Sequence, residues 1–264
     1  MTDTPTTALS HHNLNDVFYR DRSLVNDIIA RGETPDFVAI SAWHILGRKL
    51  SPAELRVLNA ILITMMEHGL TPSAIATRSI YMSAPENLQG AVAAGLMAVG
   101  SSFVGTVENN ARLLNRLVSA PGDDRAALAR EIVADHRSQR KFMPGFGHHL
   151  HKPDDPRALR LLEIAEENGL FGDHCEALKL LAAEVDAQAG KHITINATGA
   201  VSALLGELRV PVELMRGFCV LGRTSGLVAH VAEEQKRPTG RFIWDLVDKA
   251  VPYAPEEDEE QADG

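Results

Sequence analysis

The sequence predicts an all-α fold. Alanine and leucine are abundant, aromatic residues make up only 5% of the 264 residues, and several segments begin with a helix-capping pattern followed by apolar residues at helical spacing. Hydrophobic residues account for 45% and charged residues for 23%, which is typical of a globular protein rather than a disordered one. A chain of this length forms one or two domains.

Two segments share the same helix-start pattern. In SPAELRVLNAILITMMEHG, Ser51 stands at the N-cap and Glu54 follows three residues later, which forms a capping box. Ser83 and Glu86 repeat this spacing ahead of NLQGAVAAGLMAVG. The small residues of that second segment predict that another helix approaches it closely.

Three further segments complete the predicted helices. DDPRALRLLEIAEENG begins with Asp155 as N-cap and ends before Gly169, which is a natural stop. DDRAALAREIVADHRSQR is amphipathic, and VELMRGFCVLGRTSGLVAHVAEEQK is a long apolar helix. Only HITIN, residues 192–196, resembles a strand, and it is too short to imply a sheet.

The composition of the chain predicts its cellular location and excludes some classes of partner. No apolar run reaches membrane-spanning length, the N-terminus lacks the pattern of a signal peptide, and Cys175 and Cys219 are too few for a disulfide framework, so we expect a cytoplasmic protein. The net charge is −9, but six acidic residues lie in 255–264, which we expect to be a disordered tail. Because residues 1–254 then carry only −3, neither nucleic acid nor an acidic membrane is an expected partner.

The segment GFGHHLHKPDDPR, residues 145–157, concentrates glycine and histidine before a helix start. A phosphate-binding loop, a metal site and an acid–base site beside a ligand are the three alternatives. Gly145 and Gly147 satisfy G-x-G, but Leu150 stands where the next glycine is required and no strand precedes the loop. A dinucleotide-binding loop is therefore excluded.

A metal site has limited support. His148, His149 and His151 with Asp154 offer ligands, but their spacing does not match a helical i, i+4 pair. No cysteine cluster or H-E-x-x-H motif accompanies them. We therefore expect no metal and no tightly bound cofactor.

The acid–base alternative has a physical rationale. Gly145 and Gly147 let the backbone approach a flat ligand such as adenine, and a histidine beside them exchanges protons near neutral pH. Arg157, in the first turn of the next helix, is suited to bind a carboxylate. The residues alone equally allow a plain turn with a solvated arginine, and both interpretations stay open at this point.

Four further segments accompany the G-F-G-H and D-P-R motifs in chain order. They are RDRSLVNDIIARG (20–32), MMEHGLTPS (65–73), GLMAVGSSFVG (95–105) and CVLGRTSGLVAHVAEEQKRP (219–238). Together these motifs resemble the citrate synthase superfamily, and most of all its citryl-CoA lyases, including the lyase module of ATP-citrate lyase. The resemblance runs from about residue 17 to residue 253. Within it, residues 20–32 resemble the opening helix of the family.

The resemblance implies a helical fold with a large domain, residues 1–104 and 201–254, and a smaller inserted domain, residues 105–200, that carries the GFGH loop. It also implies a homodimer with a shared active site, and a CoA thioester as substrate. The implied activity is cleavage of citryl-CoA, or of a related 3-hydroxy-acyl-CoA, to acetyl-CoA and an oxo acid such as oxaloacetate.

The resemblance also implies roles for individual residues. Those implied to hold CoA are Gly145, Phe146 and Gly147, and the implied acid–base residue is His148. Those implied to bind the substrate are His68, Arg157, Arg223 and, from the partner subunit, Arg237. Structural roles stay open for the last group: Arg223 needs a carboxylate partner in any case, His68 suits a helix C-terminus, and Arg237 suits a solvated surface.

The chain departs from the family pattern at the catalytic aspartate. In INATGA, residues 195–200, Thr198 stands at the catalytic position that an aspartate occupies in the family, and a threonine hydroxyl is no useful proton acceptor at neutral pH. Phe103 stands where synthases carry a histidine, as it does in the lyase modules. Glu67 or Glu108 is the nearest substitute carboxylate in the sequence. The alternative is a non-catalytic or altered-specificity CoA-binding protein, and the synthase reaction is less compatible with Thr198.

Overall fold

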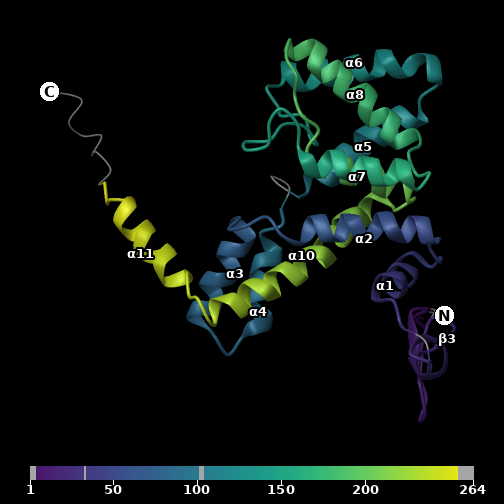
Figure 1. Cartoon of the computed structure of the whole chain (residues 1–264), viewed down its shortest axis with the longest axis vertical. Helices are drawn as coiled ribbons and strands as arrows, with labels where there is room; N and C mark the ends of the chain where they lie inside the picture. Colours follow the sequence, from purple (N-terminus) through teal and green to yellow (C-terminus); the bar gives the residue numbers. More distant parts are fainter. Residues whose placement is uncertain (1–3, 33, 101–103, 255–264) are drawn as a thin grey trace. The chain divides into compact units, whose positions relative to one another are not determined.

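The computed structural model describes residues 4–32, 34–100 and 104–254, and most of these residues are helical (Figure 1). The chain forms two compact units. Unit 1 comprises residues 1–64 and 104–218, and unit 2 comprises residues 65–103 and 219–264. Among the described residues, no helix combines the length and the apolar character that crossing a membrane requires. The predicted domain boundaries near residues 105 and 200 divide the chain differently and stay a prediction.

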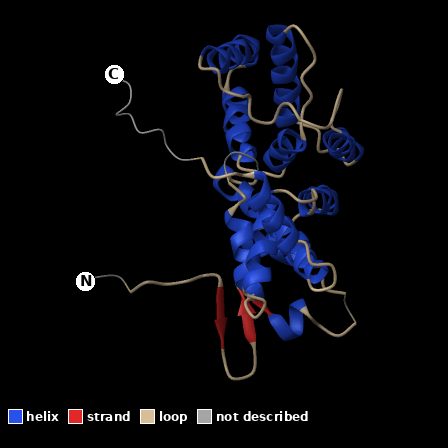
Figure 2. Ribbon diagram, turned by 90° about the vertical axis from the view of Figure 1, so that its left-hand side faces the viewer, coloured by secondary structure: helices blue, strands red, loops and turns tan. Residues whose placement is uncertain are grey.

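Unit 1 opens with a small antiparallel sheet, which corrects the all-helical prediction for this segment. Strands β1 (Ser10–His12), β2 (Val17–Tyr19) and β3 (Arg22–Ser23) pair in that order (Figure 2). The β-branched and aromatic residues of β2 favour an extended backbone. The expected opening helix is reduced to a five-residue π-helix, Leu24–Ile28.

The expected strand at residues 192–196 does not form. Ile195 makes a single isolated β-bridge to Phe146, and the other residues of the segment are not part of a described β-strand. Its backbone groups bond instead to the GFGH loop, because a lone strand must find its hydrogen-bond partners elsewhere.

The helices of unit 1 include one that is buried along most of its length. They are α1 (Phe37–Leu46), α2 (Pro52–Met66), α5 (Thr106–Ser119), α6 (Arg125–Ser138), α7 (Pro156–Glu167), α8 (Asp173–Ala189), α9 (Ala197–Glu207) and α10 (Val212–Glu234), of which α2 and α10 end in unit 2. Every residue from Gly199 to Gly206 is buried, and α5, α7 and α8 pack against this helix. α9 is therefore the centre of the unit, and its N-terminus faces the GFGH loop.

The predicted helix starts are partly confirmed. Ser51 and Glu54 form the capping box, with the Ser51 N–H 2.7 Å from Glu54 Oε2 and the Glu54 N–H 3.2 Å from Ser51 Oγ. The second predicted cap is wrong, because Ser83 is the last residue of α3 (Pro72–Ser83). Helix α4 (Leu88–Met97) begins instead after Asn87, whose side chain accepts the Gly90 N–H at 2.9 Å.

Unit 2 contains α3, α4, the end of α10, and α11 (Gly240–Ala250). The predicted close approach to the small-residue helix is confirmed. A Cβ placed on Gly95 of α4 would lie 2.0 Å from Thr77 Oγ1 and 2.7 Å from the Ser73 carbonyl oxygen, both on α3. Helix α11 packs against α3. Phe103 and the acidic tail, residues 255–264, lie outside the described residues.

Candidate active site

The GFGH loop is hydrogen-bonded to the segment that leads into α9. Gly145 and Gly147 have φ angles of +86° and +77°, which favour glycine. The Gly147 N–H donates to the Thr194 carbonyl at 2.8 Å, and the Asn196 N–H donates to the Gly145 carbonyl at 3.0 Å. A Cβ on Gly145 would lie 2.9 Å from the Cα of Gly199, so the close approach also requires glycine.

These contacts are those of a turn, which is one part of the structural interpretation that the sequence left open; the other part, a solvated Arg157, does not hold, because Arg157 pairs with buried Asp155. The Gly147 carbonyl accepts the Asn196 side-chain amide at 2.9 Å, and Phe146 is buried. Several backbone groups of the loop are therefore engaged with the protein's own chain. Contact between CoA and Gly145, Phe146 or Gly147 stays a prediction.

Asp155 joins the starts of two helices and holds Arg157. Its side chain is fully buried, and one oxygen accepts the Arg157 backbone N–H and Nε, each at 3.0 Å. The other oxygen accepts Arg157 Nη2 at 2.8 Å and the Ala197 N–H at 3.1 Å. Burial alone raises the pKa of Asp155, but the hydrogen bonds and charge of Arg157 outweigh it and lower that pKa below its ordinary value. Asp155 is therefore an anion that positions Arg157.

His148 is held as a neutral donor. Its Nδ1 accepts the backbone N–H groups of Leu150 and His151, each at 3.1 Å, so the proton of the neutral ring lies on Nε2. Burial, followed by the charges of His151 and Arg157, lowers the pKa of His148 to about 4. Nε2 lies 3.4 Å from Arg157 Nη2. Because both groups donate, one substrate oxygen can accept from both.

The structure does not favour a metal at this site. His148, His151 and Asp155 bring ligand atoms within 4.8 Å of one another. However, both oxygens of Asp155 already accept from the Arg157 guanidinium, and His148 Nδ1 accepts two backbone N–H groups. Asp154, a candidate ligand from sequence, instead bonds His192 Nε2 at 2.9 Å. A divalent cation would have to displace these donors beside a guanidinium charge.

The hydroxyl proton of Thr198 is used in a hydrogen bond within the chain, and a catalytic role for this residue stays a prediction. The Asn196 side chain is oriented by its Nδ2 donating to Gly147, so its Oδ1 is an acceptor. Thr198 Oγ1 donates to this Oδ1 at 2.7 Å and lies 2.8 Å from Thr106 Oγ1, which must then donate to Thr198. Thr198 therefore joins the N-terminus of α9 to the start of α5.

The two glutamates considered as substitutes for aspartate are both ion-paired. Glu108 in unit 1 lies 2.6 Å from Arg216. In unit 2, Glu67 lies 3.1 Å from His230 and 3.5 Å from Arg223. Burial raises the pKa of Glu67, but the backbone N–H after it and these two partners lower it overall. The geometry thus favours neither as a strong base.

Arg223 has a structural role in unit 2. It is 5% exposed, with Nε donating to Ser73 Oγ, Nη1 to the Met66 carbonyl and Nη2 to Thr71 Oγ1, each at 3.0 Å. These bonds tie the end of α2 to the start of α3. The carboxylate that the sequence required is Glu67, and binding of a substrate carboxylate by Arg223 stays a prediction.

His68 and Arg237 lie in exposed turns of unit 2. Helix α2 ends at Met66, and the His68 N–H donates to Glu67 Oε1 at 2.8 Å. The Arg237 N–H donates to the Glu233 carbonyl at 2.7 Å in the turn after α10. The structure thus brings His148 and Arg157 together in unit 1, and His68 and Arg223 to the same glutamate in unit 2. The substrate roles of His68 and Arg237 stay predictions.

Sequence reasoning missed the roles of three buried residues, Asp155, Arg78 and His230. Asp155 was expected only as a helix cap, although an aspartate before Pro-Arg can also pair with that arginine. Arg78, which is 1% exposed, and His230 were not assigned, although a lone arginine within the apolar helix α3 already required a buried partner.

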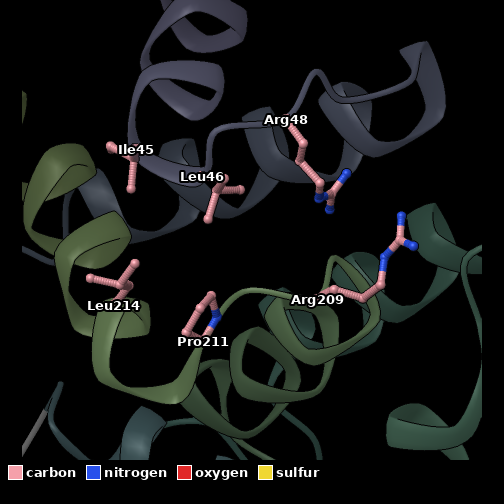
Figure 3. Close-up of a pocket in the computed structure, with 6 residues that line it drawn as sticks. All are labelled: Ile45, Leu46, Arg48, Arg209, Pro211 and Leu214. Carbon is pink, nitrogen blue, oxygen red and sulfur yellow. The ribbon is translucent and has the colours of Figure 1, made fainter. Parts of the chain in front are cut away.

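A cavity of about 370 Å³ in unit 1 lies apart from the predicted site residues (Figure 3). Its lining residues are Ile45, Leu46, Arg48, Arg209, Pro211 and Leu214. Arg48 pairs with Glu54 at 2.9 Å, so its charge is already balanced within the chain.

The profile of the citrate synthase C-terminal domain matches residues 10–243. The chain belongs to the citrate synthase family. This confirms the resemblance drawn from the motifs and the citrate synthase-like helical fold. Members of this family act on CoA thioesters.

Curated relatives share about a quarter of their residues with this family member. ATP-citrate synthase subunit 1 of Sordaria macrospora is 25% identical over 224 residues, which is 78% of this chain and 32% of that protein. Putative citrate synthase 2 of Mycobacterium bovis is 26% identical, over 73% of this chain and 52% of that protein. The chain therefore spans about a third to a half of the length of these relatives.

Solved structures give a more complete match. The citryl-CoA lyase from Hydrogenobacter thermophilus is 29% identical with a TM-score of 0.81, and the match covers 96% of both chains. An ATP citrate lyase of Methanosaeta concilii, solved with (3S)-citryl-CoA, is 19% identical with a TM-score of 0.75, over 97% of this chain and 43% of that one. The second likeness shows the fold alone.

Proposed function

We propose that the chain is a carbon–carbon lyase that cleaves citryl-CoA, or a related 3-hydroxy-acyl-CoA, to acetyl-CoA and an oxo acid such as oxaloacetate. The observation that carries this proposal is the pair of His148 and Arg157, whose donors lie 3.4 Å apart on a frame built by buried Asp155. The full-length similarity to a citryl-CoA lyase supports it.

In such a cleavage the substrate hydroxyl gives its proton to solvent water and becomes a carbonyl, and the product carbon later takes one proton back, so no net proton is gained or lost. The electron pair of the broken carbon–carbon bond forms the thioester enolate, whose carbon then takes a proton. With a pKa of about 4, His148 is neutral at pH 7, and its Nε2–H donates a hydrogen bond that stabilises negative charge on the reacting oxygen as the hydroxyl proton leaves. Arg157 binds a carboxylate beside it. The geometry therefore favours the donor half of the acid–base role predicted for His148.

The proposal keeps, residue by residue, the roles that the family resemblance implies for the remaining residues. His68 and Arg223 bind the substrate's oxygen and carboxylate groups, Arg237 comes from the partner subunit, and the Gly145–Gly147 loop holds CoA. Exposed apolar residues on α11, next to the Arg237 turn, support a homodimer: Phe242 is 66% exposed, Trp244 54% and Leu246 55%. Exposed large apolar side chains that gather on one helix are typical of an interaction surface.

A second candidate is a CoA-binding protein of this family without lyase activity. The hydrogen bond from Thr198 to Asn196 favours it, because the position that carries the family's catalytic aspartate has neither a carboxylate nor a proton to give. Loss of one acid–base group costs roughly 10²–10⁴-fold in rate, so weak lyase activity is compatible with Thr198.

The test is to mix the purified protein with citryl-CoA and follow oxaloacetate through malate dehydrogenase and NADH. His148→Ala removes the proposed donor, and His149→Ala, whose ring stacks on His148 at 4.7 Å, is the matched control. Turnover that is lost in His148→Ala and kept in His149→Ala supports the lyase. No turnover, with CoA binding still measurable by calorimetry, supports the second candidate. A gain of activity in Thr198→Asp would show that the missing carboxylate limits the reaction.

A further inference from the structure

A hydrogen-bonded chain of charged and polar groups in unit 2, buried except at Glu67, joins the two turns that carry His68 and Arg237. At one end, Glu67 accepts the backbone N–H of His68 at 2.8 Å. At the other end, Glu234, which is 5% exposed, accepts the N–H of Gly240 at 2.7 Å and so closes the turn between α10 and α11. Arg237 lies within that turn.

Arg78 and His230 connect these two glutamates. Arg78 Nη1 donates to Glu234 Oε2 at 2.8 Å, and its Nε donates to His230 Nδ1 at 2.9 Å. Because a guanidinium can only donate, Nδ1 of His230 accepts and the ring proton lies on Nε2. Nε2 faces Glu67 Oε2 at 3.1 Å. The direction of donation therefore runs from Arg78 through His230 to Glu67.

His230 does more than neutralise a buried charge. Arg78 already has two carboxylate partners, Glu233 and Glu234. The side chain of His230 is 9% exposed, whereas that of Glu67 is 48% exposed. The chain thus leads from a buried cation to a carboxylate at the surface, and that carboxylate binds the backbone of the His68 turn and lies 3.5 Å from Arg223.

We propose that His230 is a positioning residue, which fixes Glu67 and thereby holds the His68 turn and Arg223 in the geometry that binds substrate. The proposal rests on the proposed function where it concerns substrate. The held turn itself can be measured without any substrate.

The test compares His230→Leu with His230→Gln. Leucine removes both hydrogen bonds, whereas the glutamine carbonyl can accept from Arg78 while its amide donates to Glu67. His174→Leu is the control, because His174 in unit 1 is likewise partly buried and bonds Asn115 at 3.0 Å. The readouts are amide hydrogen exchange of the intact protein, residue by residue, and steady-state cleavage of citryl-CoA.

In His230→Leu we expect amide exchange at His68 and Gly69 to rise roughly tenfold or more, with exchange at buried Leu227 and Val231 unchanged. We expect kcat/KM to fall roughly 10- to 100-fold, as misplaced binding groups produce. In His230→Gln we expect both the slow amide exchange at His68 and Gly69 and the value of kcat/KM to return most of the way to those of wild type. His174→Leu changes neither.

Three results overturn the inference. One is unchanged exchange at His68 and Gly69 in His230→Leu. Another is amide exchange in His230→Leu that becomes faster at Leu227 and Val231 by as much as at His68 and Gly69, which would show a general loss of stability. A third is a glutamine variant no better than leucine. If the wild-type protein does not cleave citryl-CoA, the proposed function fails, while the exchange measurements still decide the role of His230.

Discussion

Replacing Asp155 with asparagine tests how the candidate site of unit 1 is held together. Asp155 accepts three hydrogen bonds from Arg157 and one from the Ala197 N–H, and its side chain is fully buried. Asparagine keeps one acceptor oxygen but places an NH₂ group where the second oxygen was. At least one donor then faces another donor, and the Arg157 guanidinium loses its counter-charge.

The magnitude follows from these contacts. Removing one partner of a buried ion pair costs about 3–5 kcal/mol. Arg157 is 27% exposed and regains some hydration, and asparagine caps a helix as well as aspartate does, so we expect a loss of about 3 kcal/mol. Asp154→Asn is the matched control, because Asp154 is 43% exposed and pairs with His192, so it should cost less than about 1 kcal/mol.

The assay is urea unfolding followed by the fluorescence of Trp43, which is buried in unit 1, in a Trp244→Phe background. The pKa of Asp155 lies below its ordinary 3.8, so its stabilisation is complete above pH 3.8 and is lost as pH falls through the folded-state pKa. The difference in the free energy of unfolding between wild type and Asp155→Asn should therefore be complete at pH 7 and become smaller as the pH falls below 3.8. A loss no larger than that of Asp154→Asn, or a gap that ignores pH, refutes the reasoning.

Three more predictions concern stability. Gly226→Ala should lower the free energy of unfolding in urea by about 2–3 kcal/mol, because its Cβ would lie 2.0 Å from the Met66 carbonyl oxygen. In the control Gly217→Ala, in the same helix, the added Cβ meets no described atom within 4 Å and should raise that free energy by up to about 1 kcal/mol; equal effects of the two changes would contradict this. Ser51→Ala should lose about 1 kcal/mol with the capping box, and an unchanged urea midpoint would count against that cap. The pKa of His192 is raised above 6.5 by Asp186 and Asp154. At pH values below 6.5, His192→Ala should therefore have a lower Tm than wild type, and this difference in Tm should disappear as the pH rises through the folded-state pKa. A difference in Tm that persists at pH 9 would rule out this pairing.

The helical class and several helix ends follow from the sequence because they depend on residues a few positions apart. The bond between Ser51 and Glu54 and the cap at Asp155 were both predicted and both form. Local sequence patterns gave a wrong helix start where two possible capping residues lie close together. Ser83 and Asn87 are both good caps, and the chain uses Asn87 because α3 continues through Ser83.

The family, and the residues of its binding motifs, were also accessible from sequence, since short motifs such as GFGH and DPR are contiguous. How those side chains are used was not. Thr198 donates to Asn196, Arg223 binds the end of α2, and His230 links Arg78 to Glu67. A side chain with several donors or acceptors bonds whichever groups the packing of distant segments brings within about 3 Å. The sequence by itself determined which chemical groups this protein carries and which helices present them, while only the tertiary structure decided which of those groups bond to one another.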